Sequence, residues 1–277
     1  MSAIQIKNLV RDYGGGKGVF DVSFHVDQGE AFGFLGPNGA GKTTTIRHLM
    51  GFLKARAGKC TIDGMDCWSE RDKVQARLGY IPGEISFFDD MSGTEFLRFI
   101  ADYRRIGTHS RTQELLELFE LDPKSKIKKM SKGTKQKLGI VAAFMHDPDI
   151  ILLDEPTSGL DPLMQNRFVN FVAKEKEQGK TILMSSHIFE EVERTCDRIG
   201  IIRKGRMTAV DSAAALRERH TRSYTVTLEN EAAAEAFAAD FGGTRSGTKV
   251  TVTTKQSLEE IFMDYYGGDD NDQHGII

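Results

Sequence analysis

The sequence is poor in cysteine, has no excess of basic residues and contains no long apolar run. Its three cysteines, Cys60, Cys67 and Cys196, fit neither a C-x-x-C nor a zinc spacing, which indicates reduced structural thiols. A net charge of -3 over 277 residues argues against general nucleic-acid binding, which needs a basic surface. No apolar run approaches the roughly 20 residues of a membrane-spanning helix. Polar residues such as Lys7 and Arg11 interrupt any apolar core of a signal peptide, so we expect none.

What the chain does contain suits a globular fold. Its 277 residues, of which 39% are hydrophobic, are enough for one large domain or two unequal ones with a buried core.

The glycine-rich segment Gly36–Thr44 organises the chain. It follows the apolar run 31–35 and precedes residues 46–50, whose apolar members recur at helical spacing. Strand, glycine turn and helix are the context in which G-x-x-x-x-G-K-[ST] marks a phosphate site, and an ordinary glycine-rich turn is the alternative. The glycines let successive N–H groups point inward, and we expect Lys42 to reach the β- and γ-phosphates and Thr43 to ligate Mg²⁺. The expected nucleotide-binding residues of this segment are Gly36, Pro37, Asn38, Gly39, Ala40, Gly41, Lys42, Thr43 and Thr44.

Two acids follow the continuous apolar run 150–153, which predicts a central parallel strand. Ligands of open parallel sheets lie beyond the carboxyl ends of the strands, so Asp154 and Glu155 should face the glycine segment. One of the two carboxylates then suits Mg²⁺, and the other suits proton abstraction from water. A solvated acidic turn is the simpler interpretation, but it leaves the apolar run unexplained. His187 follows the buried run 181–184 at the same edge, although an isolated histidine is usually structural.

Three further features have two readings each. Tyr13, just before Gly14–Gly16, is either a ring that stacks on a purine or a packed aromatic. Ser131 is predicted to be a helix N-cap, and an N-cap is also an anion site. The adjacent Phe87 and Phe88 are either tucked into a neighbouring core or exposed as a docking surface.

These elements, in this order, resemble the ATP-binding subunit of a bacterial ATP-binding-cassette (ABC) transporter of the exporter type. The resemblance covers residues 2–215, in which Gly36–Thr44 is similar to the Walker A motif and Ile150–Glu155 to Walker B with its catalytic glutamate. Met130–Gln136 is similar to the signature L-S-G-G-Q-x-Q. The resemblance further implies that Ser158–Asp161 is the D-loop, with Asp161 among the nucleotide-binding residues. It makes His187 the switch histidine and Tyr13 the aromatic that stacks on adenine.

The implied fold is α/β, a P-loop NTPase core of the ABC type with a β-subdomain and a helical subdomain, plus a small C-terminal α+β extension. We expect the ATPase domain over 1–219, with its helical subdomain at about 84–146. Alternating and helical patterns predict a βαβα extension over 220–266, followed by a polar, flexible tail at 267–277.

Two parts of the sequence depart from the family pattern. Lys132 replaces the first glycine of the signature and Thr134 its glutamine, whereas Ser131 and Gly133 are kept. Gly83-Glu84 stands where the family usually has a glutamine that ligates Mg²⁺ and links to the membrane subunit. Glu84 or a water molecule would take that place.

The resemblance implies an ATP-hydrolysing subunit that powers a membrane transporter, an exporter of a drug, peptide or lipid. Two such subunits, identical or different, would face head to tail, so that Ser131 and Gly133 of one cover the ATP and Mg²⁺ held by Lys42 and Thr43 of the other. A transmembrane permease would contact the chain near Gly83–Phe88, at the cytoplasmic face of the membrane.

Other classes fit less well. A GTP-dependent switch needs an N-K-x-D segment, which is absent from the sequence, and a nucleotide kinase has no use for Glu155 or the signature. A soluble ABC ATPase acting on ribosomes, DNA repair or cluster assembly is the alternative, although such proteins usually carry a second cassette or long coiled coils. The transported substrate and the direction of transport are not encoded in any motif of the chain.

Overall fold

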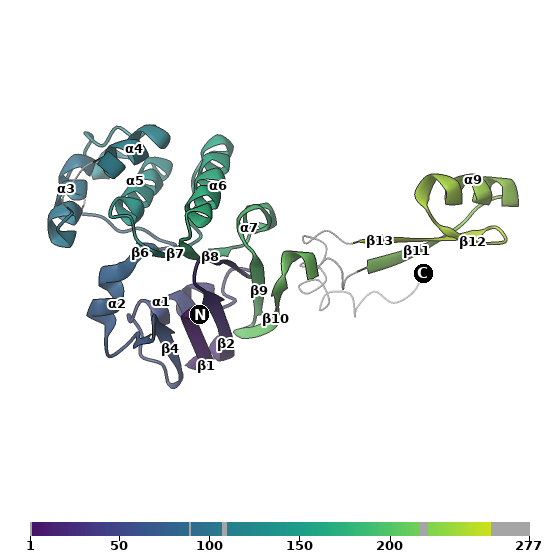
Figure 1. The fold of residues 1–277 in the computed structure, drawn as a ribbon, viewed down its shortest axis with the longest axis horizontal. Helices are drawn as coiled ribbons and strands as arrows, with labels where there is room; N and C mark the ends of the chain where they lie inside the picture. Colours follow the sequence, from purple (N-terminus) through teal and green to yellow (C-terminus); the bar gives the residue numbers. More distant parts are fainter. Residues whose placement is uncertain (1, 89, 107–109, 216–220, 256–277) are drawn as a thin grey trace. The chain divides into compact units, whose positions relative to one another are not determined.

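The computed structural model describes residues 2–88, 90–106, 110–215 and 221–255. The chain divides into two compact units, Met1–Val210 and Asp211–Ile277 (Figure 1). The helix expected within 256–266 and the tail 267–277 lie outside the described residues. None of the described helices combines the length and the apolar character needed to cross a bilayer.

A six-stranded sheet forms the centre of the first unit, in the order β10-β9-β3-β8-β7-β6. Its strands are β3 (Ala31–Leu35), β6 (Leu78–Ile81), β7 (Ile150–Asp154), β8 (Thr181–Ser186), β9 (Arg198–Arg203) and β10 (Arg206–Ser212). The pairs from β9 through β6 are parallel. Every residue of β3, β7 and β8 is buried, as expected of strands covered on both faces. The apolar runs that predicted these strands are therefore confirmed.

A four-stranded antiparallel sheet packs beside it, in the order β2-β1-β4-β5. Its strands are β1 (Ser2–Gly14), β2 (Lys17–Asp27), β4 (Ala57–Ile62) and β5 (Met65–Asp66). Apolar and polar residues alternate over 4–10 and 20–26, which predicts two half-buried strands. β1 and β2 extend beyond these ranges because their pairing continues to the hairpin at Gly14 and Lys17. Phe24 of β2 stacks on Phe32 of β3 with ring centroids 4.9 Å apart, which joins the two sheets.

Helices cover the sheets. They are α1 (Lys42–Leu49), α2 (Arg71–Arg77), α3 (Gly93–Arg104), α4 (Ser110–Leu118), a 3₁₀ turn at Ile127–Lys129, α5 (Lys132–Phe144), α6 (Pro162–Glu177) and α7 (Phe189–Thr195). α1 packs between the two sheets, and α3, α4 and α5 lie together (Figure 1). Ser92 and Glu95 have the spacing of a capping box, which the structure confirms, because the Glu95 N–H donates to Ser92 Oγ and the Ser92 N–H donates to Glu95 Oε2. The hydrogen bonds that the Glu95 carboxylate accepts from the Ser92 N–H and hydroxyl lower its pKa to about 2.

The second unit contains β11 (Thr221–Thr227), α9 (Glu231–Phe241), β12 (Thr244–Ser246) and β13 (Lys249–Lys255), with strand order β11-β13-β12. α9 covers the sheet through Ala234, and Val250 lies fully buried under it. The alanine-rich stretch 231–241 predicts a helix, which α9 confirms. The short strand β12 was not predicted, because its three residues are polar and exposed. The alanine-rich piece 211–219 predicts a connecting helix, but this prediction is wrong at its start, since β10 continues to Ser212.

Candidate functional site

The carboxyl ends of three neighbouring strands meet at one edge of the parallel sheet. The register sets Leu35 of β3 opposite Ser186 of β8, and Asp154 of β7 opposite Ser185. The segments that begin at Gly36, Glu155 and His187 therefore leave the sheet side by side. The edge predicted from sequence brings these candidate residues together.

The loop between β3 and α1 is built around glycines. Gly39 and Gly41 have φ of 80° and 114°, which L side chains rarely adopt. Gly41 is the N-cap of α1, and a Cβ there would lie 2.8 Å from Val19 Cγ1. The backbone thus wraps closely around the start of α1, whose N–H groups and dipole attract an anion. The arrangement matches a phosphate-binding loop.

Lys42 is buried inside this loop, with only 3% of its surface exposed. Its Nζ donates to the carbonyl oxygens of Gly36 at 2.6 Å and Pro37 at 3.2 Å, and lies 3.1 Å from Glu155 Oε1. The ammonium therefore points into the site, where the two carbonyl oxygens and the Glu155 carboxylate balance its positive charge. Thr43, the next residue of α1, is partly exposed.

Asp154 is completely buried at the end of β7. Its Oδ1 accepts a hydrogen bond of 2.6 Å from Ser185 Oγ, whereas its Oδ2 has no partner among the described residues. A Cβ at Gly83 would lie 3.3 Å from this Oδ2. A buried oxygen without a donor calls for a ligand, and Mg²⁺ commonly takes one or two protein oxygens together with substrate phosphates. Asp154 and Thr43 therefore fit Mg²⁺.

Glu155 is held in a left-handed backbone conformation, with φ of 49°. Its N–H donates both to the carbonyl oxygen and to Oγ of Ser185, each at 3.1 Å, which supports this conformation. The carboxylate lies between the Lys42 ammonium and the His187 ring: Oε1 lies 3.1 Å from Lys42 Nζ, and Oε2 lies 3.5 Å from Nδ1 of the half-exposed His187. Ser185 thus positions both acids. The sequence predicted Ser185 at the carboxyl end of a buried strand, but no motif indicated that it bonds to both acids.

Tyr13 lies close to the same loop, at the end of β1, and 51% of its surface is exposed. It follows the residue pair Asp12–Gly18 of the β1–β2 hairpin, and a Cβ at Gly41 would lie 3.3 Å from the Gly18 carbonyl oxygen. The hairpin therefore packs on the phosphate-binding loop. The guanidinium of Arg11 lies 5.3 Å from the Tyr13 ring. Because half of its surface is exposed, Tyr13 is not a core residue, and its ring is available for stacking.

Ser131, Gly133 and Asp161 stand apart from this group. Among the described residues no hydrogen bond or ion pair joins them to Lys42 or Glu155. Ser131 is the exposed N-cap of α5, and its Oγ accepts from the Thr134 N–H at 3.1 Å, which confirms the predicted cap. Asp161 is the N-cap of α6, accepting from Met164. That role was missed, although Asp-Pro before a helix is a usual start signal.

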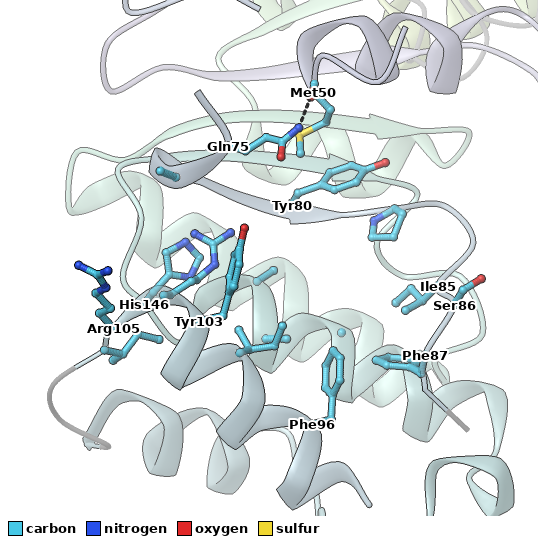
Figure 2. Close-up of a pocket in the computed structure, with 18 of the residues that line it drawn as sticks. Met50, Gln75, Tyr80, Ile85, Ser86, Phe87, Phe96, Tyr103, Arg105 and His146 are labelled. Carbon is cyan, nitrogen blue, oxygen red and sulfur yellow. Dashed lines mark hydrogen bonds between the residues drawn. The ribbon is translucent and has the colours of Figure 1, made fainter. Parts of the chain in front are cut away.

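A groove of about 890 Å³ opens between the β6 side of the sheet and helices α3 and α5. Figure 2 shows Phe87 and Phe96 facing each other in it, with Tyr103 and His146 further along. Phe87 packs edge-on against Phe96, with centroids 5.0 Å apart, whereas Phe88 is 57% exposed beside Phe99. Each of the two sequence interpretations therefore holds for one phenylalanine.

One end of the groove is basic. The partly buried Arg104 donates to the Leu78 carbonyl oxygen at 3.0 Å, and His146 Nε2 contacts the same oxygen at 3.0 Å. Burial and the neighbouring guanidinium lower the pKa of His146 to about 4. No carboxylate among the described residues pairs with Arg104. Glu84, close to the opposite end, is exposed.

Comparison with known proteins gives consistent matches. The family model described as ABC transporter matches residues 19–158. The linearmycin resistance ATP-binding protein LnrL of Bacillus subtilis is 36% identical over 92% of this chain and 83% of its own length. The bacitracin transport ATP-binding protein BcrA of Bacillus licheniformis is 35% identical over 82% of this chain and 76% of its own. A solved ATP binding subunit of an ABC transporter is 32% identical with a TM-score of 0.72, over 79% of this chain and 93% of that one.

Proposed function

Because this chain belongs to the ATP-binding proteins of ABC transporters, it is an ATPase subunit, and we propose that it powers the export of a drug, peptide or lipid. One observation carries the proposal: the phosphate-binding loop, Asp154, Glu155 and His187 converge at one sheet edge. Export is supported by two relatives, which are named for linearmycin resistance and bacitracin transport. We assign the ATPase domain to residues 1–219, its helical part to about 84–146 and an extension to 220–266.

The residues suggest a division of roles in hydrolysis. Lys42 and the N–H groups of 36–44 bind the phosphates, and Tyr13 offers its exposed ring to the adenine. Mg²⁺ bound by Thr43 and Asp154 would neutralise charge on the β- and γ-phosphates. Glu155 orients or deprotonates the attacking water, and His187 approaches the γ-phosphate from beside it.

A second ATP-binding subunit, identical or different, completes the site. The start of α5 is an exposed helix N-terminus that carries Ser131 and Gly133, and among the described residues no hydrogen bond or ion pair joins it to Lys42 or Glu155 of its own chain. A head-to-tail pair would lay this N-terminus over the γ-phosphate of the other subunit, with Asp161 nearby. Closure of the pair would exclude water and assemble the catalytic geometry.

The groove beside Gly83–Phe88 would receive a transmembrane permease, which places the chain at the cytoplasmic face of the membrane. The aromatic lining suits an apolar face of a partner helix, and the exposed Phe88 enlarges the surface. Arg104, which lacks a carboxylate among the described residues, suits an acidic side chain on that helix.

Two measurements test this function. The purified full-length chain should hydrolyse ATP in the presence of Mg²⁺, and Lys42→Ala should weaken ATP binding itself. An affinity-tagged chain should also co-purify from membranes with a polytopic membrane protein. Association with ribosomes, DNA-repair or cluster-assembly proteins instead would favour the soluble alternative. A chain without ATP binding would contradict both.

A further inference from the structure

The start of α5 is fastened to the loop that carries Glu155. We call residues 155–160 the acid loop. Lys132 Nζ donates to Ser158 Oγ at 3.1 Å, and Gln136 Nε2 donates to the Pro156 carbonyl oxygen at 2.6 Å. Both donors lie in the first two turns of α5. Two separate hydrogen bonds therefore join one helix end to one short loop.

The backbones are also in close contact there. A Cβ on Gly133 would lie 2.8 Å from the Gly159 carbonyl oxygen, closer than real Cβ atoms approach. The absence of a side chain at Gly133 thus lets α5 rest directly on the acid loop. If the start of α5 shifts toward the acid loop, the loop must move as well, because no space separates the two backbones.

Lys132 is an exposed residue whose side chain lies along the loop. A Cβ on Gly159 would lie 2.9 Å from both Cγ and Cδ of Lys132, and Gly159 itself has φ of 84°. The aliphatic stem therefore covers Gly159, and the ammonium reaches Ser158 beyond it. Lys132 replaces the first glycine of the family signature. A glycine at this position has no side chain, so it could not make this contact.

The acid loop is in turn tied to Glu155. The Ser158 N–H donates to the Glu155 carbonyl oxygen at 3.1 Å, and the Glu155 N–H is bonded to Ser185 at the end of β8. The start of the loop is thus fixed to the sheet and its middle to α5. If Ser158 moves, the main chain between Ser158 and Glu155 must change its conformation. Such a change would alter the position of the Glu155 carboxylate.

We propose that Lys132 is a positioning residue that sets Glu155 through Ser158 when the start of α5 engages a phosphate. The inference rests on the proposed function, because α5 engages the ATP of the other subunit whereas Glu155 serves its own. In a pair made of two copies of this chain, ATP bound at the start of α5 would thereby prepare Glu155 of the same chain and so link the two sites.

The first experiment measures steady-state ATP hydrolysis by the full-length chain. Lys132→Met and Ser158→Ala should each lower kcat by about tenfold with KM for ATP within about twofold, and the Hill coefficient should fall from near 2 toward about 1. The double variant should be no slower than either single one, because both remove the same contact. Lys132→Arg should recover most of the activity, since its guanidinium can still donate to Ser158. Lys129→Met, which removes an exposed lysine just before α5, is the matched control and should behave like the unmodified chain.

Two results of this assay would overturn the inference. If Ser158→Ala is as active as Lys129→Met while Lys132→Met is impaired, Lys132 acts on the phosphate directly. If Lys132→Met, Ser158→Ala and the double variant all match the control, the contact has no role. A chain that neither binds nor hydrolyses ATP would instead refute the proposed function.

Hydrogen exchange provides a test that needs no turnover. In a Glu155→Gln background, ATP should slow amide exchange both in residues 36–44 and in the acid loop. Adding Lys132→Met should abolish the ATP-dependent protection of the acid loop and retain that of 36–44. Equal protection of the acid loop with and without Lys132 would contradict the inference.

Discussion

The ammonium of Lys42 lies 3.1 Å from Oε1 of Glu155, so the cation proposed to bind phosphate and the acid proposed to activate water are direct neighbours. A phosphate that binds Lys42 would compete with this carboxylate for the same ammonium. We therefore expect ATP binding to exchange one anionic partner of Lys42 for another. The same exchange would release the Glu155 carboxylate to meet water.

This pairing leads to a prediction for Glu155→Gln. The amide removes the competing negative charge from Lys42, so ATP should bind at least as tightly as to the unmodified chain. Hydrolysis should fall by about 10²–10⁴-fold, the usual contribution of a general base. Calorimetric titration with ATP and a phosphate-release assay measure the two effects separately. Turnover near that of the unmodified chain would remove Glu155 from its role.

Ser185→Ala should affect the metal requirement. Its hydroxyl donates to Asp154 Oδ1, and without it neither carboxylate oxygen of this buried acid would have a hydrogen bond among the described residues. We expect a loss of about 1–3 kcal/mol in the free energy of unfolding and a higher Mg²⁺ concentration for half-maximal hydrolysis. Ser186→Ala is the matched control, because its hydroxyl bonds to Glu191 instead. An unchanged Mg²⁺ requirement in Ser185→Ala would contradict the prediction.

His146 predicts a pH dependence of stability. The ring pKa is lowered from 6.5 to about 4 in the folded chain. Between these values the unfolded chain binds the proton and the folded chain does not, so the free energy of unfolding decreases as the pH falls through this window. A shift of this size corresponds to at most about 3 kcal/mol. Urea unfolding at pH 7 and pH 4.5 should show a smaller difference for His146→Gln, whereas His25→Gln, at an exposed position, should keep it.

Arg104→Glu should separate hydrolysis from partner binding. The residue lies at one end of the groove, away from the Lys42–Glu155 pair, so ATP binding should be retained. Reversing the charge should repel an acidic partner helix and reduce co-purification of the membrane protein by about tenfold, equivalent to 1.4 kcal/mol. Arg98→Glu changes an exposed arginine of the same helix outside the groove lining and serves as the control. Equal recovery with both variants would argue against the proposed contact.

Most residues at the sheet edge could be predicted from the sequence, but few of the hydrogen bonds that position them could. β3, β7 and β8 could be predicted because fully buried strands are continuously apolar, and the glycine spacing marked the phosphate-binding loop. Ser185 could not be assigned, because its bonds to the two acids depend on the register of β8 against β7. The contact between Lys132 and Ser158 joins positions 26 residues apart on different elements, so no local pattern reports it.

Gly83 lies on the stretch of main chain that connects the groove to Asp154. It lies against the Asp154 oxygen that has no hydrogen-bond partner among the described residues, and two residues later Ile85 lines the groove. The main chain of residues 83–85 therefore spans from this carboxylate to the surface where a partner would sit. A partner that shifts Ile85 would change the space beside Asp154 through a few peptide units, and any bulkier residue at 83 would close that space.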